Sequence, residues 1–476
     1  MIILDLIKDE PVFQTLIKKY KLRVYGNIFY NSLNEEFGGC VDKFVLSPES
    51  FIKGDYCFSL SSEDSLYLGS SRSGTHPIYF RKINDSIVYS QKLKDVVNAS
   101  PVNKLSEEGA YQFLTYEYVA DPLTLIEEVY KVPSANFLYV DKYLKYKITE
   151  FKPQITDFNE NFNSIEIFKD SIYMAHENRL KTESRNALLL SGGVDSCVSA
   201  IVLSNIDKNI DCFTFSTLNA EQDEYADARC TAEHLGLNLE RVIIDPNEEF
   251  DLETLIYESN FFYPGAIMIS AIAAQSGPGT NFFACQDTRL HTPALNQLDK
   301  FVFSISNSQR EILSKAMRAL PNIFSSENRI SKFINRGRYA NDLPKYINEL
   351  FFHKHNLDLG LGYYEQDKNF FTELNFITKE IFSGFKGNSR QIYNEIVKLA
   401  WHRQYSDDIQ YLLSTAAHFG SSCQMPWYDN DLAFTSAQLP MKDATKFVRG
   451  RSGHSTKPKK VNKYILRKTF DSLLPD

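Results

Sequence analysis

The residues best suited to chemistry lie in one short string, Ser191–Ser196, which reads Ser-Gly-Gly-Val-Asp-Ser. The apolar run Ala187–Leu190 predicts a buried strand before it, and Cys197–Leu203, rich in Ala, Val and Ile, predicts a helix after it. A glycine turn between a strand and a helix directs backbone N–H groups and the positive end of the helix at one point. Two glycines also let a ligand approach the backbone closely. The string therefore predicts a phosphate-binding loop, and the simpler alternative is a glycine turn that merely starts a helix.

The predicted loop implies a ligand that carries phosphate groups, together with Mg²⁺. The residues expected to bind this ligand are Leu189, Ser191, Gly192, Gly193, Asp195 and Ser196. The serine hydroxyls add hydrogen-bond donors, and the carboxylate of Asp195 is expected to hold Mg²⁺ against the pyrophosphate.

The loop lacks the Gly-Lys-Ser/Thr triplet of loops that grip the β and γ phosphates for transfer of the γ phosphate. Its Ser-Gly-Gly-x-Asp-Ser order instead resembles the PP-loop of the ATP pyrophosphatases. That resemblance implies cleavage of ATP between the α and β phosphates, with AMP left on the substrate. A carboxylate does not react with an amine at neutral pH because oxide is a poor leaving group, and transfer of AMP supplies a good one.

The surrounding pattern predicts a sheet that positions the loop. Strands are expected at Ala187–Leu190, Cys212–Phe215 and Arg241–Ile244, with helices between them, and this alternation predicts a doubly wound parallel sheet. From about residue 310 onward the pattern is mainly helical. Residues 1–150 instead predict a compact, strand-rich domain. Its strands are expected at Tyr56–Leu60, Ser65–Leu68, Pro77–Arg81, Ile87–Ser90 and Phe137–Val140.

Composition narrows the class of protein. The chain has 476 residues, 43% of them hydrophobic, which is enough for two domains with large cores. A net charge of −8 argues against general nucleic-acid binding, and the seven cysteines include no Cys-x-x-Cys pair of zinc spacing. The longest apolar stretch falls short of the roughly 18–20 residues that cross a bilayer, and the N-terminus does not resemble a signal peptide. A cytoplasmic protein without a membrane partner is expected.

Further segments resemble the asparagine synthetase family, in that family's order over nearly the whole chain. They are Ser71–Phe80, Pro122–Pro133, Asp223–Ala226, Met425–Leu432 and Lys463–Arg467. The last two are similar to the family's x-Pro-Phe-Leu-Asp-x-x-Leu and Lys-Tyr-x-Leu-Arg motifs. The resemblance implies a glutaminase-like αββα sandwich of the N-terminal-nucleophile hydrolase type in residues 1–155. It also implies an ATP-pyrophosphatase domain in residues 160–476, with a doubly wound parallel sheet and a helical C-terminal part.

Two departures from the family change what the resemblance implies about nitrogen. Family glutaminases use an N-terminal cysteine, exposed after removal of Met, whereas residue 2 here is Ile and both Cys40 and Cys57 lie too far into the chain. No glutamine hydrolysis is expected, as in the β-lactam synthetases, and the domain is expected to serve as a scaffold or to dock a protein partner. Ser422–Gln424 stands where the family carries Glu-x-Arg, so the acceptor is expected to differ.

A third departure concerns Phe283–His291, which stands where the family has Ser-Gly-x-Gly-x-Asp-Glu. Asp287 remains as the second expected ligand of Mg²⁺ and pyrophosphate, in a register that a shift of one or two residues would also fit. Arg289 is expected to take part in catalysis by binding a substrate carboxylate or the leaving pyrophosphate. The alternative for this segment is an ordinary loop.

Near the C-terminus, Lys463 is the expected catalytic cation that stabilises charge in the second half-reaction, and the alternative is a surface lysine. The segment from 449 to 463 has no acidic residue and six basic ones, which are Arg449, Arg451, Lys457, Lys459, Lys460 and Lys463. Such a segment is expected to stay mobile until an anion binds, as a lid over ATP and substrate. A solvated surface loop and a nucleic-acid contact are the alternatives.

These observations predict an AMP-forming carbon–nitrogen ligase that adenylates a carboxylate and joins it to an amine. The two groups belong either to one molecule, as in the lasso-peptide cyclases, or to two, and the acceptor is a small molecule, a peptide or a protein. One alternative is amidation of a deazaguanine carboxylate, as in 7-cyano-7-deazaguanine synthase, with a protein as a further acceptor. That family's four-cysteine zinc site is absent here. The others are tRNA modification and a non-catalytic partner-binding protein that retains the fold.

Overall fold

A computed structural model of the chain describes two regions of regular structure, and the second begins with α4 (Ser164–Glu177). The residues described are 2–17, 19–31, 41–100, 104–116, 119, 121–151, 164–182, 184–207, 209–218, 223–245, 264–285, 297–320, 334, 337–343, 346, 409–438, 445–449 and 458–474.

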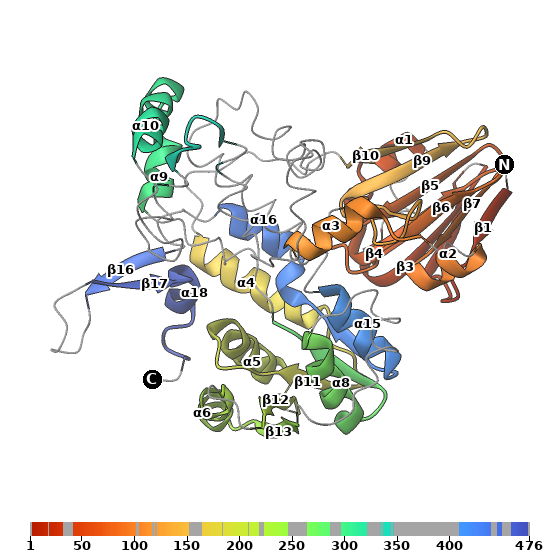
Figure 1. Ribbon diagram of the computed structural model, residues 1–476. Helices are drawn as coiled ribbons and strands as arrows, with labels where there is room; N and C mark the ends of the chain where they lie inside the picture. Colours follow the sequence, from red (N-terminus) through yellow and green to blue (C-terminus); the bar gives the residue numbers. More distant parts are fainter. Residues whose placement is uncertain are drawn as a thin grey trace.

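The first region contains two β-sheets that pack face to face (Figure 1). The six-stranded sheet has the order β10-β9-β5-β4-β3-β2, and the four-stranded sheet has the order β1-β7-β6-β8. The strands are β1 (Ile2–Asp5), β2 (Phe13–Ile17), β3 (Tyr20–Asn31), β4 (Ile52–Ser61), β5 (Ser65–Ser70), β6 (Tyr79–Ile83), β7 (Ser86–Ser90), β8 (Tyr130–Lys131), β9 (Asn136–Asp141) and β10 (Tyr146–Glu150). The helices are α1 (Val41–Leu46), η1 (Pro48–Ser50), α2 (Leu93–Ala99) and α3 (Glu107–Tyr116).

Helices cover the outer faces of both sheets. Because successive side chains of a strand point to opposite faces, β4 contributes to two separate cores. Phe58 packs with residues of α1 on the outer face of the six-stranded sheet. Its neighbour Cys57 packs between the two sheets, against Phe80 and Tyr89. On the outer face of the four-stranded sheet, Tyr79 packs against α2. The layers therefore run helix, sheet, sheet, helix.

The expected strands of this region correspond to β4, β5, β6, β7 and β9. The strand expected to start at Pro77 starts instead at Tyr79. A proline has no backbone N–H to donate to a neighbouring strand, which explains the later start.

The second region contains a five-stranded sheet in which every neighbouring pair is parallel. Its order is β13-β12-β11-β14-β15, so the first strand in sequence lies at the centre and the chain winds outward in both directions. The doubly wound parallel sheet expected from the sequence is confirmed. The strands are β11 (Arg185–Leu189), β12 (Asp211–Thr217), β13 (Asn238–Ile244), β14 (Thr280–Phe283) and β15 (Ser422–Gln424).

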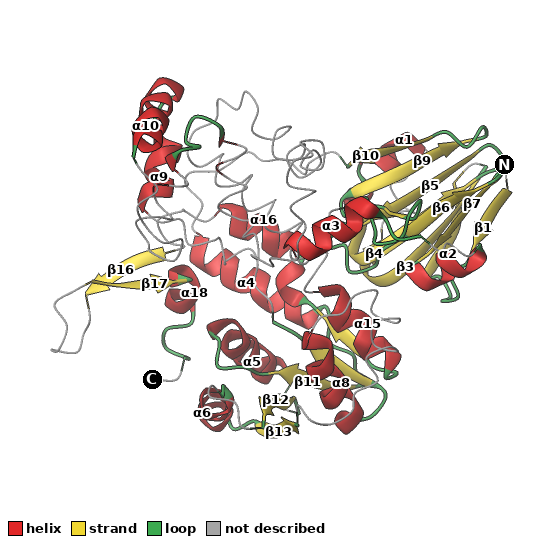
Figure 2. Cartoon of the chain, in the orientation of Figure 1, coloured by secondary structure: helices red, strands yellow, loops and turns green. Residues whose placement is uncertain are grey.

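Helices pack on both faces of the parallel sheet (Figure 2). On one face, α6 covers Leu188 and Phe283. On the other, α8 and α15 cover Ala187 and Phe282, while α5 contributes to both cores. The helices of this region are α5 (Val194–Ile206), α6 (Tyr225–Leu235), α8 (Pro264–Ser276), α9 (Gln297–Ser304), α10 (Asn307–Ala319), α15 (Gln410–His418), η4 (Pro426–Tyr428), α16 (Asn430–Gln438) and α18 (Tyr464–Thr469).

The described C-terminal residues are less uniformly helical than expected. Besides β15, an antiparallel hairpin forms from β16 (Thr445–Arg449) and β17 (Pro458–Asn462). Arg449, Lys459 and Lys460 of the basic segment lie in this hairpin, where each strand gives the other a partner for its backbone hydrogen bonds. Arg451 and Lys457 lie outside the described residues. Within the described ranges, no helix is long and apolar enough to cross a membrane.

The core of the parallel sheet provides a stability test. Phe282 on β14 is 1% exposed, and its replacement by Ala is expected to lower the free energy of unfolding by about 3–5 kcal/mol through lost burial and a new cavity. Ile243 on β13 of the same sheet is 58% exposed, so Ile243→Ala serves as the matched control and is expected to cost about 0.5 kcal/mol or less. Urea unfolding of both variants measures the difference. Equal losses would contradict the described packing.

Candidate nucleotide-binding and ligase site

The predicted phosphate loop lies at the switch point of the parallel sheet. β11 ends at Leu189 and α5 begins at Val194, so the turn between them stands at the carboxyl end of the central strand. In the sheet, β11 lies between β12 and β14. The chain runs from β11 outward through β12 and β13 and then continues to β14 on the other side of β11, so the direction of winding reverses at β11. In sheets of this kind the crevice beyond the strand ends, at the point where the winding reverses, is the usual ligand site.

Hydrogen bonds within the turn fix its shape. The hydroxyl of Ser196 lies 2.9 Å from the carbonyl oxygens of both Ser191 and Gly193, and it also accepts a hydrogen bond from the Ser191 N–H at 3.2 Å. The Gly193 N–H in turn donates to the Ser191 hydroxyl at 3.2 Å. Gly192 and Gly193 are both exposed. The two serines therefore shape the turn, while the glycine backbone faces solvent.

The glycine at position 192 is required by a neighbour that the sequence analysis did not single out. A Cβ atom on Gly192 would lie 2.8 Å from the Cβ of Asp227 and 3.0 Å from its Oδ2 atom. Asp227 stands in the first turn of α6, directly after the segment Asp223–Ala226. Its carboxylate is thus a second acidic group beside the loop. The signal available in the sequence was its position at the start of the helix after β12.

Asp195 and Lys463 are brought together by the fold. Asp195 occupies the first turn of α5, Lys463 immediately precedes α18, and both are 7% exposed. The ammonium of Lys463 donates a hydrogen bond to Oδ2 of Asp195, across 268 residues of chain. The buried contact excludes the alternative that Lys463 is a surface lysine.

Two further residues that the sequence predicts for this site, Asp287 and Arg289, lie outside the described residues. The described chain reaches Cys285, two residues beyond the end of β14. Burial, with a smaller contribution from the nearby charge of Asp195, raises the pKa of the Cys285 thiol to about 12. At neutral pH this thiol is protonated, so Cys285 contributes a neutral group at this end of the sheet.

A buried hydrogen-bond chain fixes α5 to its neighbours. The Trp427 indole N–H donates to the Ser199 hydroxyl at 2.9 Å, and Ser199 Oγ lies 2.8 Å from Nε2 of His176. The other ring nitrogen of His176 lies 2.8 Å from the Ile172 carbonyl oxygen, which can only accept, so Nδ1 carries the proton and Nε2 accepts from Ser199. Burial lowers the pKa of His176 to about 4. The chain thus connects α4, α5 and η4 around a neutral imidazole.

The segment Ser422–Gln424, which departs from the family pattern, is engaged in internal contacts. Ser422 Oγ donates to Oδ1 of Asn281 at 2.8 Å, and Gln424 Nε2 donates to the same oxygen at 2.9 Å. Lys181 adds a hydrogen bond to Ser422 Oγ at 3.0 Å. Sequence reasoning missed Asn281 and Lys181, because isolated polar residues in a strand or turn give no local sign of a shared network.

The chain is similar to known proteins over part of its length. The family model described as asparagine synthase matches residues 168–476. Asparagine synthetase [glutamine-hydrolyzing] 1 of Bacillus subtilis (strain 168) is 24% identical over 206 residues, which are 42% of this chain and 32% of that protein. The microcin J25-processing protein McjC of Escherichia coli is 24% identical over 211 residues, 44% of this chain and 39% of that protein. The matched stretches thus span well under half the length of either relative.

Among solved structures, the similarity is remote. The glutamine phosphoribosylpyrophosphate amidotransferase of B. subtilis, complexed with ADP and GMP, is 12% identical. The match covers 60% of this chain and 59% of that chain with a TM-score of 0.20, which is too low to carry an argument.

The neutral state of His176 provides a test of the buried chain. The unfolded chain takes up a proton on this residue as the pH falls from 6.5 to 4, whereas the folded protein does not, so stability present above pH 6.5 is lost toward pH 4. We expect this residue to contribute up to about 1.4 kcal/mol per pH unit to that slope.

Urea unfolding across this pH range measures the slope for the parent, for His176→Gln and for His234→Gln, whose side chain is exposed on α6. The His176 variant should lose part of the slope and the His234 variant should keep it. Equal slopes in the parent and His176→Gln would contradict the assignment.

Proposed function

Because the chain belongs to the asparagine synthase family, we propose that it is an ATP-dependent ligase that adenylates a carboxylate and joins it to an amine. The observation that carries this proposal is the buried contact between Asp195 of the phosphate loop and Lys463 at the carboxyl edge of the parallel sheet. An acidic group for a metal–phosphate complex and a cation for developing negative charge are the two groups that adenylate chemistry needs in one place.

The proposed reaction has two steps. A carboxylate oxygen of the substrate attacks the α phosphorus of ATP, the bond from that phosphorus to the bridging oxygen breaks, and pyrophosphate leaves. The amine nitrogen then attacks the acyl carbon and loses a proton, and AMP leaves with the electron pair of the acyl–oxygen bond. The exposed backbone of Gly192 and Gly193 binds phosphate oxygens at the start of α5. Lys463 stabilises the negative charge that forms as AMP leaves in the second step.

The residues at the loop fit Mg²⁺ when it arrives with a nucleotide. Proteins usually hold this ion through one or two carboxylates together with substrate phosphates, and Asp195 supplies one buried carboxylate. Among the described residues, no group of three His, Cys, Asp or Glu side chains is placed to hold a metal without help. Bound Mg²⁺ would supply positive charge to pyrophosphate. Asp287 stays the proposed second ligand, and Arg289 stays the proposed anion-binding residue.

Nitrogen from glutamine is not part of the proposal. We assign the helix-sheet-sheet-helix layers of the first region to a glutaminase-like domain that is inactive. Cys57, the described cysteine of this region, is 0% exposed in the middle of β4. Burial raises the pKa of its thiol to about 12, so it stays protonated and unreactive at neutral pH. In this proposal the amine comes from the acceptor itself.

The proposed substrates include peptides. One relative is a processing protein of microcin J25, and its similarity over 44% of this chain favours an acid and an amine carried by a peptide, with cyclisation when both belong to one molecule. Small molecules and proteins are the other proposed amine acceptors. A deazaguanine carboxylate is a further proposed acid, and the same assay tests each of them. A partner-binding protein without catalysis predicts no nucleotide turnover at all.

Turnover of ATP tests the ligase proposal. We expect AMP and pyrophosphate to form only when one acid of a panel of peptides and small acids is present. Asp195→Asn and Lys463→Met are each expected to lower the rate by on the order of 100-fold or more, because each removes a charge from the reacting centre.

Lys468→Met is the matched control, since Lys468 is exposed on the same helix, α18, and should leave the rate unchanged. ADP and phosphate as products, or full activity in the Lys463 variant, would contradict the proposal. Failure of the parent to bind an ATP analogue would favour the partner-binding alternative.

Cysteine chemistry tests the absence of glutamine hydrolysis. We expect no glutamate to form from glutamine and ATP above the buffer control. Iodoacetamide should modify the exposed Cys230 and leave Cys57 untouched in the folded protein. Glutamate release that is lost in Cys57→Ser would overturn this part of the account.

A further inference from the structure

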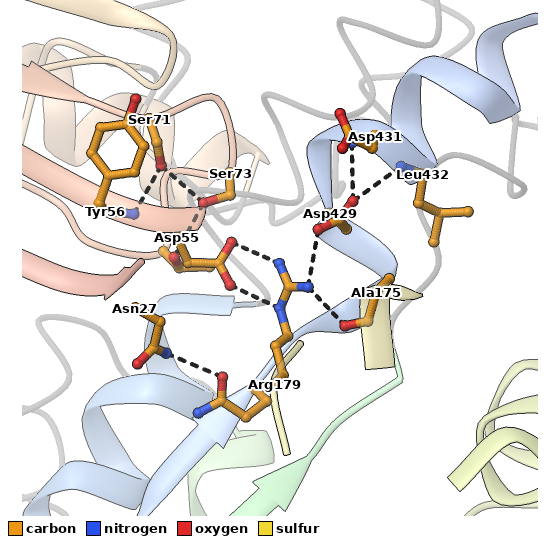
Figure 3. Close-up of polar contacts among 12 residues, drawn as sticks. Asn27, Asp55, Tyr56, Ser71, Ser73, Ala175, Arg179, Asp429, Asp431 and Leu432 are labelled. Carbon is orange, nitrogen blue, oxygen red and sulfur yellow. Dashed lines mark hydrogen bonds and ion pairs between the residues drawn. The ribbon is translucent and has the colours of Figure 1, made fainter. Parts of the chain in front are cut away.

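A single buried arginine joins the two regions (Figure 3). The Nε and Nη2 atoms of Arg179 donate to the two carboxylate oxygens of Asp55 at 2.8 and 2.9 Å. Its Nη1 atom donates to the Ala175 carbonyl at 2.8 Å and to Asp429 Oδ2 at 3.1 Å. The side chain is 0% exposed and stands 5.0 Å from the ring centroid of Phe29. Each of the three guanidinium nitrogens therefore donates to at least one acceptor, and the side chain is shielded from solvent.

The three charged groups come from three separate parts of the chain. Asp55 belongs to β4 of the first region, Arg179 follows α4, and Asp429 stands between η4 and α16. Burial lowers the pKa of Arg179, but the two carboxylates more than offset this and the net direction is upward. The cation is thus kept charged. Removing one partner from such a buried group leaves an uncompensated charge, which is strongly unfavourable.

Asp429 links Arg179 to the start of α16 through hydrogen bonds. Its Oδ1 atom accepts hydrogen bonds from the Asp431 N–H at 2.9 Å and the Leu432 N–H at 3.1 Å, while Oδ2 accepts from Arg179. These two N–H groups have no partner within the helix itself, so the carboxylate caps the helix. One side chain therefore fixes both the cation and the start of α16.

Two contacts lead from this cluster to the ligase site. η4 immediately precedes Asp429, and its Trp427 donates to Ser199, one helical turn after Asp195 on α5. Asn27 of the first region donates to Gln424 Oε1 at 3.2 Å. The carbonyl of Gln424 accepts the N–H of Ala284, directly after β14. The first region is thus linked to α5 through η4 and to the end of β14 through Gln424.

We propose that Asp55, acting through Arg179, is a positioning residue for the reaction in the second region. The effect that this inference predicts on the reaction rate rests on the proposed ligase function. The first region, without chemistry of its own, holds η4 and the start of α16 at the geometry that adenylation and amine attack require. Misplacement of reacting groups by about 1 Å can slow a reaction on the order of 100-fold, so a small shift of η4 is enough.

The substitution Asp55→Asn keeps the shape of the side chain and removes its charge. We expect kcat for AMP formation to fall on the order of tenfold or more. Affinity for an ATP analogue should change less than about threefold, because the hydrogen bonds that shape the phosphate loop are internal and do not involve Arg179. Loss of folding alone would not divide kcat from nucleotide affinity in this way.

The matched control is Lys53→Met. Lys53 also joins the two regions, through an ion pair with Asp431 at 2.9 Å, but both side chains are more than half exposed. This variant should keep kcat within about twofold of the parent, as exposed ion pairs contribute little. If Asp55→Asn does not fold, Arg179→Lys takes its place, since it keeps the charge but has only three N–H donors for the four acceptor atoms that Arg179 contacts. The double variant that combines Asp55→Asn with Arg179→Lys should be no slower than the slower of the two single variants, because both substitutions break the same contact between these side chains.

Hydrogen exchange separates this inference from the ligase proposal. The amides of Asp431 and Leu432 should exchange faster in Asp55→Asn than in the parent or in Lys53→Met, whether or not the parent shows turnover. Unchanged exchange, or a kcat within twofold of the parent in a folded Asp55→Asn variant, would overturn the inference. A parent without any ATP turnover, but with faster exchange in the variant, would remove the proposed function and leave the physical coupling in place.

Discussion

The buried contact between Lys463 and Asp195 is the interaction on which the site depends. Burial of either charge alone would be strongly unfavourable, so each side chain requires the other when no ligand is present. The backbone of Lys463 has a φ of +53°, a left-handed conformation that costs a residue other than glycine about 1 kcal/mol or more. Packing of Ile465 and Leu466 into the main core of the second region holds the chain in that conformation. The C-terminal helix α18 is thereby fixed beside the candidate phosphate loop Ser191–Ser196.

The same logic extends to the interface of the two regions. Its described polar contacts range from the exposed pair of Lys53 and Asp431 to the fully buried guanidinium of Arg179. Buried charge is a weak source of net stability but a strong source of geometric selectivity, because only one arrangement satisfies every donor.

Much of the nucleotide site follows from the sequence because its determinants are local. The strand, glycine turn and helix around Ser191–Ser196 are adjacent in the chain, and the parallel sheet follows from the alternation of strands and helices. The assignment of Lys463 to the same site as Asp195 required the family resemblance, since nothing local connects them, and their direct contact was not predicted. Arg179 was missed because its partners come from distant segments, and β15 because three residues give no measurable periodicity.

The central claim is that ATP is cleaved between its α and β phosphates by attack of a carboxylate. Turnover with the accepted acid labelled by ¹⁸O in its carboxylate group tests this most directly, with the products analysed by mass spectrometry. If the acid is adenylated, one labelled oxygen moves from the carboxylate into AMP when the amide forms. Label in inorganic phosphate together with ADP, or unlabelled AMP, would contradict the account.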